Sequence, residues 1–431
     1  MDNRVRALLL VMATTASQPA VAGGFLLQEQ SQREIGRAFS GAAASADDPS
    51  TIFYNPAGMT ELDGIQATAG GTLLFIQSGQ ENRGTQLGLP GGTVIPASGG
   101  NGGNPFASVV PVPTSYISAQ LGDTGLWAGF GVSAPFGLKL RYDDGWFGRY
   151  ESLYSNLLTL DAQPSIAWRA SEHLSIGGGI DIQYADVTLT NALPNPGSPA
   201  DGMLRVSGDD ISLGWNAGLL VKLDGGVRLG LHYRSQVKHE IKGGYALSGL
   251  AGPLSAANGT TAVRSPLTMP DIATASISAP LGTATRLMLT GRYYNWSVLK
   301  DIRFLREGQS PAVKELHYRD SWSLSAGVDH RMNDRLTLRA GAMFDRTPTN
   351  GDYLTTRIPD GDRTWATMGL SYSLTDALTL NASYAHVFID KAAMDRTDLY
   401  YEGSAAQTAV TTRTAMSGNV DMIATSVTAR F

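Results

Sequence analysis

Hydrophobic and polar residues alternate with a period of two along most of the chain. In residues 211–223, for example, Ile211, Leu213 and Trp215 share one face, and Ser212 falls on the other. Such alternation predicts strands with one apolar and one polar face. Strands are expected at about residues 64–77, 114–122, 125–142, 153–169, 173–191, 210–223, 226–245, 268–280, 283–299, 314–332, 335–348, 361–375, 377–391 and 416–431.

These strands and their connections are unlike those of soluble sheets. The runs cover roughly 10 to 20 residues, whereas strands in globular proteins usually have about 5 or 6. Tight turns such as 224–226 and 333–334 alternate with long polar loops. In lipid only a closed sheet satisfies every backbone hydrogen bond. We therefore predict an all-β fold over residues 64–431, a fourteen-stranded antiparallel transmembrane β-barrel with both ends on the periplasmic side.

The first 22 residues have the organisation of a secretory signal peptide. Arg4 and Arg6 precede a short apolar run, and Ala20 and Ala22 supply the small residues of a cleavage site. The run is too short to span a bilayer, which takes about 20 apolar residues. We expect residues 1–22 to be removed and the mature chain to reach the bacterial outer membrane as a multi-pass barrel.

Residues 23–63 precede the first predicted strand and show no alternation. They are rich in Ala, Ser and Gly, which is typical of a disordered periplasmic tail. They also contain Phe39, Ile52, Phe53 and other apolar residues, more than a solvated tail carries. We therefore predict that residues 23–63 form a plug, or hatch, folded inside the barrel.

Composition supports a membrane location and excludes several alternatives. Charged residues make up 16% of the chain, against about a quarter in soluble domains, as expected where strands face hydrocarbon. The absence of cysteine excludes disulfides, cysteine metal sites and a lipid anchor on an N-terminal cysteine. With a formal charge of −5 and no basic run, the chain is not expected to bind nucleic acid.

Several segments resemble the FadL-type family of outer-membrane long-chain fatty-acid transporters. They are Gly24-Phe25, GRAFSGAAASADDPSTIFYNPAGM at 36–59, residues 214–245, Met269-Pro270-Asp271, Tyr318-Arg319-Asp320 and IPDGDRTWATMGLSY at 358–372. Their order and spacing cover nearly the whole mature chain. The resemblance implies a fourteen-stranded barrel with an N-terminal hatch, and passive uptake of long-chain fatty acids or similar hydrophobic molecules.

The resemblance also implies a transport path and residues along it. Ligand would be captured at extracellular loops, pass to a tight lumen site and leave sideways beside a kinked third strand gated by the hatch. Asn55, Pro56 and Ala57 match the hatch motif, and Phe25 matches a hatch phenylalanine at the tight site. Lys314 matches a basic residue that contacts the ligand carboxylate; the alternative is a loop-edge lysine in solvent.

Pro135, Phe136 and Gly137 interrupt the third predicted strand. Proline cannot donate a ladder hydrogen bond, and glycine weakens a strand. Alternation resumes at Leu138. We therefore expect a gap in the wall at this gate rather than an ordinary strand end.

Two features leave the cargo open. A second basic residue of the family aligns with Asn191, and the loss of one cation weakens the case for a carboxylate. Neutral aromatic hydrocarbons such as toluene, which some family members carry, are the alternative cargo. Trp146 and Phe147 fit either a substrate-binding extracellular groove or the interfacial aromatic girdle of any barrel.

Other functional classes fit the sequence less well. A general porin has an open polar lumen, which the apolar hatch contradicts. An enzyme needs a nucleophile and base, but no G-x-S-x-G occurs, and His232 and His239 lie among charged residues of one strand. No spaced metal-ligand cluster is evident, so we expect no catalysis, cofactor or metal. The expected partners are hydrophobic small molecules, outer-membrane lipid and lipopolysaccharide, with the barrel a monomer.

Overall fold

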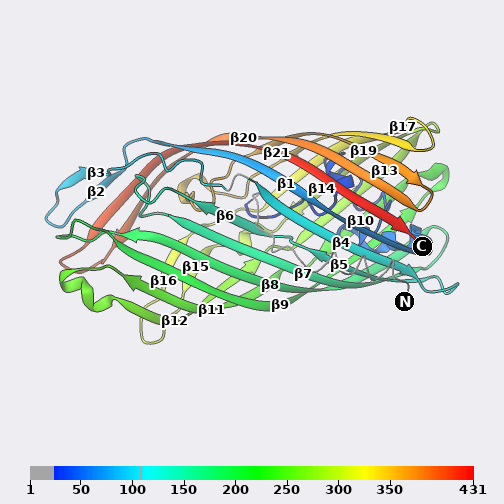
Figure 1. Ribbon diagram of the computed structural model, residues 1–431. Coiled ribbons are helices and arrows are strands. Elements are labelled where there is room, and N and C mark those ends of the chain that lie inside the picture. The colour runs from blue at the N-terminus through cyan, green and yellow to red at the C-terminus, as the bar shows by residue number, and fades with distance from the viewer. Residues whose placement is uncertain (1–23, 107–108) are drawn as a thin grey trace.

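The wall of the molecule is one antiparallel sheet that closes on itself (Figure 1). The computed structural model describes residues 24–106 and 109–431, so the predicted signal peptide lies outside the described residues. Nineteen strands share the sheet. β2 and β3 form a loop hairpin attached to the end of β21, and three wall strands are each divided into two halves, which leaves fourteen wall strands. The first, β1, pairs with the last, β21, from Gln66↔Arg430 to Asn82↔Thr414. The predicted fourteen-stranded barrel is confirmed.

The wall strands are β1 (Ile65–Asn82), β4 (Val110–Gln120), β5 (Leu126–Ser133) with β6 (Gly137–Arg141), β7 (Tyr154–Arg169), β8 (Leu174–Leu193), β9 (Gly202–Lys222), β10 (Arg228–Arg234) with β11 (Val237–Ser248), β12 (Gly259–Met269) with β13 (Ile272–Leu281), β14 (Thr285–Tyr294), β17 (Ser321–Arg331), β18 (Leu336–Asp345), β19 (Arg363–Thr375), β20 (Leu378–Tyr400) and β21 (Thr408–Arg430).

Loops carry the hairpins β2 (Gln86–Gly88) with β3 (Val94–Pro96) and β15 (Asp301–Phe304) with β16 (Ala312–Glu315). The helical segments are α2 (Gln32–Ile35), α3 (Thr51–Tyr54), η1 (Pro56–Glu61), η2 (Asp224–Gly226), η3 (Gly252–Ala257), η4 (Trp296–Val298) and η5 (Gly351–Tyr353). No helix in the described part of the chain is long and apolar enough to cross a membrane.

Several strands extend further toward the long loops than alternation predicted. β9 begins at Gly202, β20 ends at Tyr400 and β21 begins at Thr408, each beyond its predicted limit. At that end polar side chains occur on both faces of the sheet, so the one-sided pattern disappears while backbone pairing continues. The strand predicted to start at 314 instead starts at Ser321.

The outward faces of the strands form an apolar surface. Ile211 and Leu213 on β9 are 67% and 66% exposed, and Leu231 and Leu289 on other strands are also exposed. Side chains at alternate positions point inward and are mostly small or polar. Apolar residues outside and polar residues inside are the pattern of a barrel that lies in hydrocarbon.

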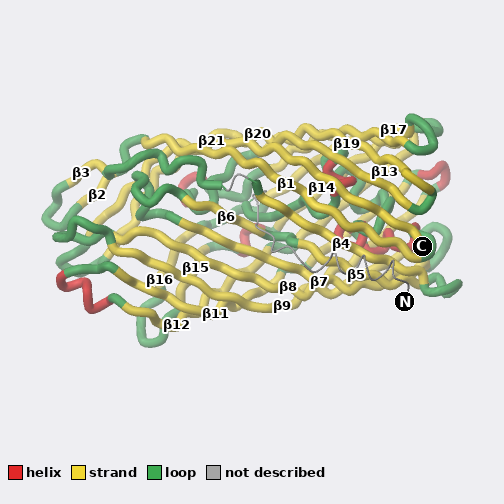
Figure 2. Tube along the Cα trace, in the orientation of Figure 1, coloured by secondary structure: helices red, strands yellow, loops and turns green. Residues whose placement is uncertain are grey.

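Residues 24–62, here called the hatch segment, fill the lumen. Figure 2 shows short helices inside the ring of strands. The segment bonds to opposite walls: Gln32 Nε2 donates to Thr114 Oγ1 on β4 at 3.1 Å, and the Gly41 N–H donates to Thr290 Oγ1 on β14 at 2.7 Å. Nearly all of its side chains are buried. The segment is therefore part of the folded core.

Glycines on the inner wall allow the hatch backbone to touch the strands. A Cβ placed on Gly230 of β10 would lie 1.9 Å from the carbonyl oxygen of Ala43. One placed on Gly341 of β18 would lie 2.3 Å from the carbonyl carbon of Arg37. Both contacts are with backbone atoms, which cannot rotate away. Part of the high glycine content thus follows from close packing between wall and hatch segment.

Replacing Gly230 by Ala should therefore loosen the hatch segment without preventing closure of the barrel. Overpacking of this kind costs about 1–3 kcal/mol. We expect a lower Tm in detergent micelles and faster proteolysis within residues 24–62. Gly79→Ala on β1 is the matched control, because nothing lies within 4 Å of a Cβ at that position. Equal Tm values for both variants would contradict this packing argument.

Candidate functional site

The third wall strand is divided between β5 and β6 at residues 134–136. β5 pairs with both β4 and β7, whereas the strand that pairs with β6 is β7. On the other edge of β6, Leu140 forms an isolated bridge with Phe106. Residues 110–114 of β4 consequently have no strand partner on the β6 side within the described chain. The ladder is thus interrupted where Pro135, Phe136 and Gly137 led us to expect a gap.

The backbone of the hatch segment covers this interruption. The Leu27 N–H donates to the carbonyl oxygen of Pro135 at 2.8 Å, and the Gly137 N–H donates to the carbonyl oxygen of Phe25 at 2.8 Å. These are the groups that a neighbouring strand would otherwise bond. The N-terminal end of the hatch segment therefore acts as a short replacement strand at the edge of β6.

Side chains complete the hydrogen bonding of the interrupted residues. The Gln30 amide donates to the carbonyl oxygen of Ala134 at 2.9 Å and accepts from the Ala134 N–H at 3.0 Å. The Phe136 N–H donates to Thr159 Oγ1 on β7 at 2.9 Å. Since unpaired buried peptide groups are costly, the interruption is stable only while the hatch segment stays in place.

An aromatic cluster lies directly inside the interruption. The Phe25 ring is 4.8 Å from Trp296 and 6.1 Å from Phe136, and Trp296 is 5.8 Å from Tyr318. All four side chains are buried. The cluster joins the hatch segment, the third wall strand and the long connection between β14 and β17. Movement of Phe25 would therefore disturb all three elements.

An apolar cavity of about 70 Å³ adjoins this cluster. Phe25 and Leu138 line one part of it. Residues of β7, β8, β9, β11 and β12, of the connection between β14 and β17, and Arg357 with Ile358 line the rest. That volume is well below the roughly 300–1,000 Å³ of typical ligand pockets. A long ligand therefore fits only if lining side chains or the hatch segment move.

Arg357 is the charged residue that lines the cavity, together with mostly aliphatic side chains. Its guanidinium donates to Asn191 Oδ1 at 2.8 Å and to Ser155 Oγ at 3.3 Å. It makes no ion pair with a carboxylate in the described part of the chain. A buried guanidinium bonded only to neutral groups retains capacity for an anion. Sequence reasoning missed this residue, although it placed the lost cation at Asn191.

Lys314, the cation predicted from the sequence, is already paired. It lies on β16 opposite Ile302, which lines the cavity. Its ammonium group contacts Glu151 and lies 2.7 Å from Asp398. Burial raises the pKa of Glu151, but Lys314 and other cations outweigh burial and hold that pKa below its usual range. Two carboxylates thus surround one ammonium group, and a role for Lys314 at a ligand stays a prediction.

Trp146 and Phe147 lie within the loop between β6 and β7 and are fully buried. The Trp146 ring stacks on Tyr142 at 3.9 Å, and its Nε1 donates to the carbonyl oxygen of Ser152 at 2.8 Å. Girdle residues face lipid, so their burial disfavours the girdle interpretation. They form the core of the extracellular loop, and neither lines the cavity described above.

Asn55, Pro56 and Ala57 join the hatch segment to a different part of the wall. Asn55 Nδ2 donates to the carbonyl oxygen of Leu219 on β9 at 2.9 Å and to that of Ala43 at 2.7 Å. Its Oδ1 accepts from the Ala57 N–H at 3.1 Å and caps η1. This motif fixes the hatch segment to β9, whereas Phe25, Leu27 and Gln30 contact the interruption.

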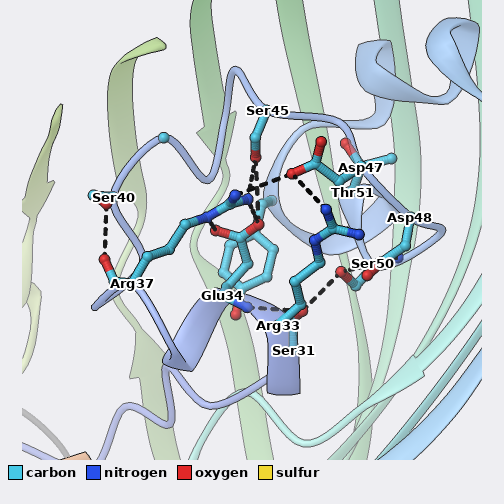
Figure 3. Close-up of polar contacts among 12 residues, drawn as sticks. Ser31, Arg33, Glu34, Arg37, Ser40, Ser45, Asp47, Asp48, Ser50 and Thr51 are labelled. Carbon is cyan, nitrogen blue, oxygen red and sulfur yellow. Dashed lines mark hydrogen bonds and ion pairs between the residues drawn. The ribbon is translucent and has the colours of Figure 1, made fainter. Parts of the chain in front are cut away.

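A buried ionic cluster fixes the turn of the hatch segment (Figure 3). Arg37 contacts Glu34 and lies 3.0 Å from Asp47 and 2.9 Å from Asp329 on β17. The carboxylates of this cluster are therefore paired with guanidinium groups. No group of three or more side chains suited to a metal ion occurs among residues 24–106 and 109–431. The cluster therefore has a structural role.

Comparison with known proteins gives one consistent picture. Residues 13–431 match the family model described as outer membrane protein transport protein (OMPP1/FadL/TodX). A long-chain fatty acid transport protein of Escherichia coli (strain CFT073) is 26% identical over 415 residues, covering 88% of this chain and 90% of that protein. Outer membrane protein P1 of Haemophilus influenzae is 28% identical over 422 residues, covering 89% of each.

Solved structures support the fold. A Pseudomonas aeruginosa FadL homologue superposes with a TM-score of 0.84 at 22% identity, covering 95% of this chain and all of that one. The Ralstonia pickettii toluene transporter TbuX superposes with a TM-score of 0.65 at 18% identity, covering 93% and 98%. At these identities the likeness concerns architecture alone.

The contact between Gln30 and Ala134 can be tested by a Gln30→Leu substitution. The change leaves two buried peptide groups of Ala134 unpaired, at a cost of about 1–3 kcal/mol. We expect hydrogen–deuterium exchange within residues 134–137 to accelerate by about tenfold or more. Gln309→Leu, at an exposed loop position, is the control. Unchanged exchange would show that Gln30 does not hold the interruption.

Proposed function

Because the chain belongs to the outer membrane protein transport protein (OMPP1/FadL/TodX) family, we propose that it takes up long-chain fatty acids or similar chains with an anionic head group. The chain is an outer-membrane β-barrel channel for hydrophobic molecules. What remains to be proposed is its preferred cargo and the path through the wall.

The single observation that carries the preference is Arg357 in the apolar cavity. A buried carboxylate needs a charged hydrogen-bonding partner, and Arg357 offers a guanidinium bonded only to neutral groups. Asn191 orients it from β8, in place of the cation expected there. Glu151 and Asp398 influence Arg357 electrostatically, but they bond Lys314 and not Arg357.

The hydrocarbon chain of the ligand supplies the other half of the recognition. Each buried methylene contributes about 0.8 kcal/mol, so an apolar path captures long chains that a water-filled pore does not. The aliphatic lining from β7 to β12 meets this requirement once the cavity widens. Extracellular loops, including the buried core around Trp146 and Phe147, would provide the first contact.

We propose that ligand leaves sideways through the interruption beside β6. The hatch segment supplies the hydrogen bonds of Pro135 and Gly137, so its displacement would expose an edge and open the wall. The path would then end in the outer leaflet. Transport needs no energy source, because the ligand moves down its own gradient.

Aromatic hydrocarbons are the second candidate cargo. The rings of Phe25, Phe136, Trp296 and Tyr318 form a buried aromatic cluster at the exit, which suits a flat neutral ligand. Solved toluene transporters share the architecture. A competition assay that follows labelled oleate and toluene uptake by the same cells decides between the two cargoes.

The members of this family are transporters, and we propose that no catalytic step accompanies transport. We further propose that the barrel works as a monomer surrounded by outer-membrane lipid and lipopolysaccharide. Cross-linking in native membranes that captured a stable dimer would contradict the monomer.

Arg357→Gln should weaken oleate binding by about tenfold or more, because a charge-assisted hydrogen bond contributes about 1.5–3 kcal/mol. Toluene binding should change little. Arg83→Gln, which replaces an exposed arginine, is the control. Lys314→Ala, measured in parallel, tests the residue predicted from the sequence. Equal losses of oleate and toluene binding in the Arg357 variant would remove its role at a head group.

Strand-forming residues at the interruption should restrict the exit. Pro135→Val/Gly137→Val gives position 135 a backbone N–H and places a β-branched side chain at both positions. Pairing with β4 therefore becomes more favourable. We expect oleate uptake to fall severalfold while the barrel remains folded. Pro253→Val, in an exposed loop helix, is the control. Full uptake in the double variant would contradict exit at β6.

A further inference from the structure

The wall contains a second interruption, between β9 and β11. Pairing of β10 with β9 ends at Arg234↔Asn216, and pairing of β11 with β9 begins only at Lys242↔Asp209. Within the described chain no register pair joins the stretches in between. The Ser235 N–H still donates to the carbonyl oxygen of Trp215 at 2.8 Å, and beyond that bond the two strands share no register pair before Lys242↔Asp209. We call this region, residues 210–214 and 236–241, the β9–β11 interruption.

Side chains replace the ladder there. Ser212 Oγ donates to the carbonyl oxygen of Lys238 at 2.8 Å, and Asp210 Oδ2 accepts from the Glu240 N–H at 3.4 Å. Both backbone groups face β9 and would normally bond its main chain. A bond to a side chain can be released by a change of rotamer, whereas a ladder bond requires the strands themselves to part.

A buried histidine occupies the inner side of the interruption. His239 Nδ1 shares a hydrogen bond with Asp210 Oδ2 at 3.0 Å, and its Nε2 lies 3.1 Å from Gln183 Oε1 on β8. With Ser212, these residues form a polar cluster that closes the wall by side-chain contacts. The cluster has no part in the hatch segment or in the exit beside β6.

The apolar cavity reaches this interruption. The cavity is lined by Gly208 on β9, which lies just outside the interruption in sequence, and by Ile241 on β11, which lies within it. Phe25 and Leu138, beside β6, line the opposite part. Residues beside both interruptions therefore line the same cavity. The second interruption is closed without the hatch segment.

The outer side of the interruption suits an amphipathic chain. Ile211 and Leu213 are highly exposed and apolar, and the Trp215 ring lies 5.3 Å from the Tyr233 ring on the same outward face. Lys238 is exposed at the same place. A hydrocarbon chain could lie against the apolar side chains while its carboxylate approaches the Lys238 ammonium group.

We propose that the β9–β11 interruption is a second lateral passage between the cavity and the outer leaflet, for unbranched apolar chains with an anionic head group. It opens when the polar cluster of Gln183, Asp210, Ser212 and His239 rearranges, independently of the hatch segment. The inference rests on the proposed uptake function and adds a route to it.

The test uses a disulfide across the interruption in the Pro135→Val/Gly137→Val background. Continuing the β9–β11 register places Ser212 opposite His239, so Ser212→Cys/His239→Cys forms the staple, and the chain has no other cysteine. Leu219→Cys/Leu231→Cys, a register pair in the intact ladder, is the matched control. Oleate uptake is measured in a host without its own channel, before and after oxidation and again after reduction.

We expect the background variant to retain a residual uptake below that of the unaltered chain. Oxidation of the Ser212–His239 staple should lower this residual uptake severalfold, with recovery on reduction. The control pair should show no such response. Uptake that is equal in the oxidised and reduced staple would overturn the proposal, as would a background variant with no uptake at all. Uptake by the unaltered chain, measured alongside, reports separately on the proposed function.

Discussion

The structure depends on one constraint, which is that a backbone surrounded by hydrocarbon must satisfy its own hydrogen bonds. The pairing of β1 with β21 meets it by closing the sheet. Low charge and apolar outward faces follow, because the same strands contact lipid. A closed wall, however, offers no way through. Any sideways passage must interrupt the strand pairing locally and replace its hydrogen bonds by others that can be broken.

Strand pairing in the wall is interrupted in two different ways. Beside β6, main-chain groups of Phe25 and Leu27 bond the edge, so that site is coupled to a whole segment in the lumen. Between β9 and β11, side chains of Ser212 and Asp210 do so, and only rotamers need to change. The first device links opening to movement of the hatch segment and to the aromatic cluster around it. The second is local, and residues beside both interruptions line the apolar cavity.

Sequence patterns predicted the barrel well because alternation is imposed by lipid outside and polar surface inside. They underestimated the strand ends near the long loops, where water reaches both faces and the pattern vanishes. Pro135 revealed the first interruption, since proline cannot join a ladder. No proline occurs in residues 210–214 or 236–241, so the sequence contains no sign of the second interruption. Arg357 was missed for a related reason: its place beside Asn191 depends on how a long loop folds back, and residue type alone does not encode that. The Lys314 assignment could not anticipate two neighbouring carboxylates from distant segments.

The position of the hatch segment also constrains how the molecule is assembled. It runs directly into β1, which pairs with β21 to close the sheet. The hatch segment bonds to walls on several sides, so we infer that it enters the interior before that seam is joined. The N-terminal residues must therefore already occupy the interior when β21 pairs with β1. Closure of the sheet consequently depends on their placement. Glycines such as Gly230, which admit the hatch backbone, thereby help to determine whether the last step of biogenesis can finish.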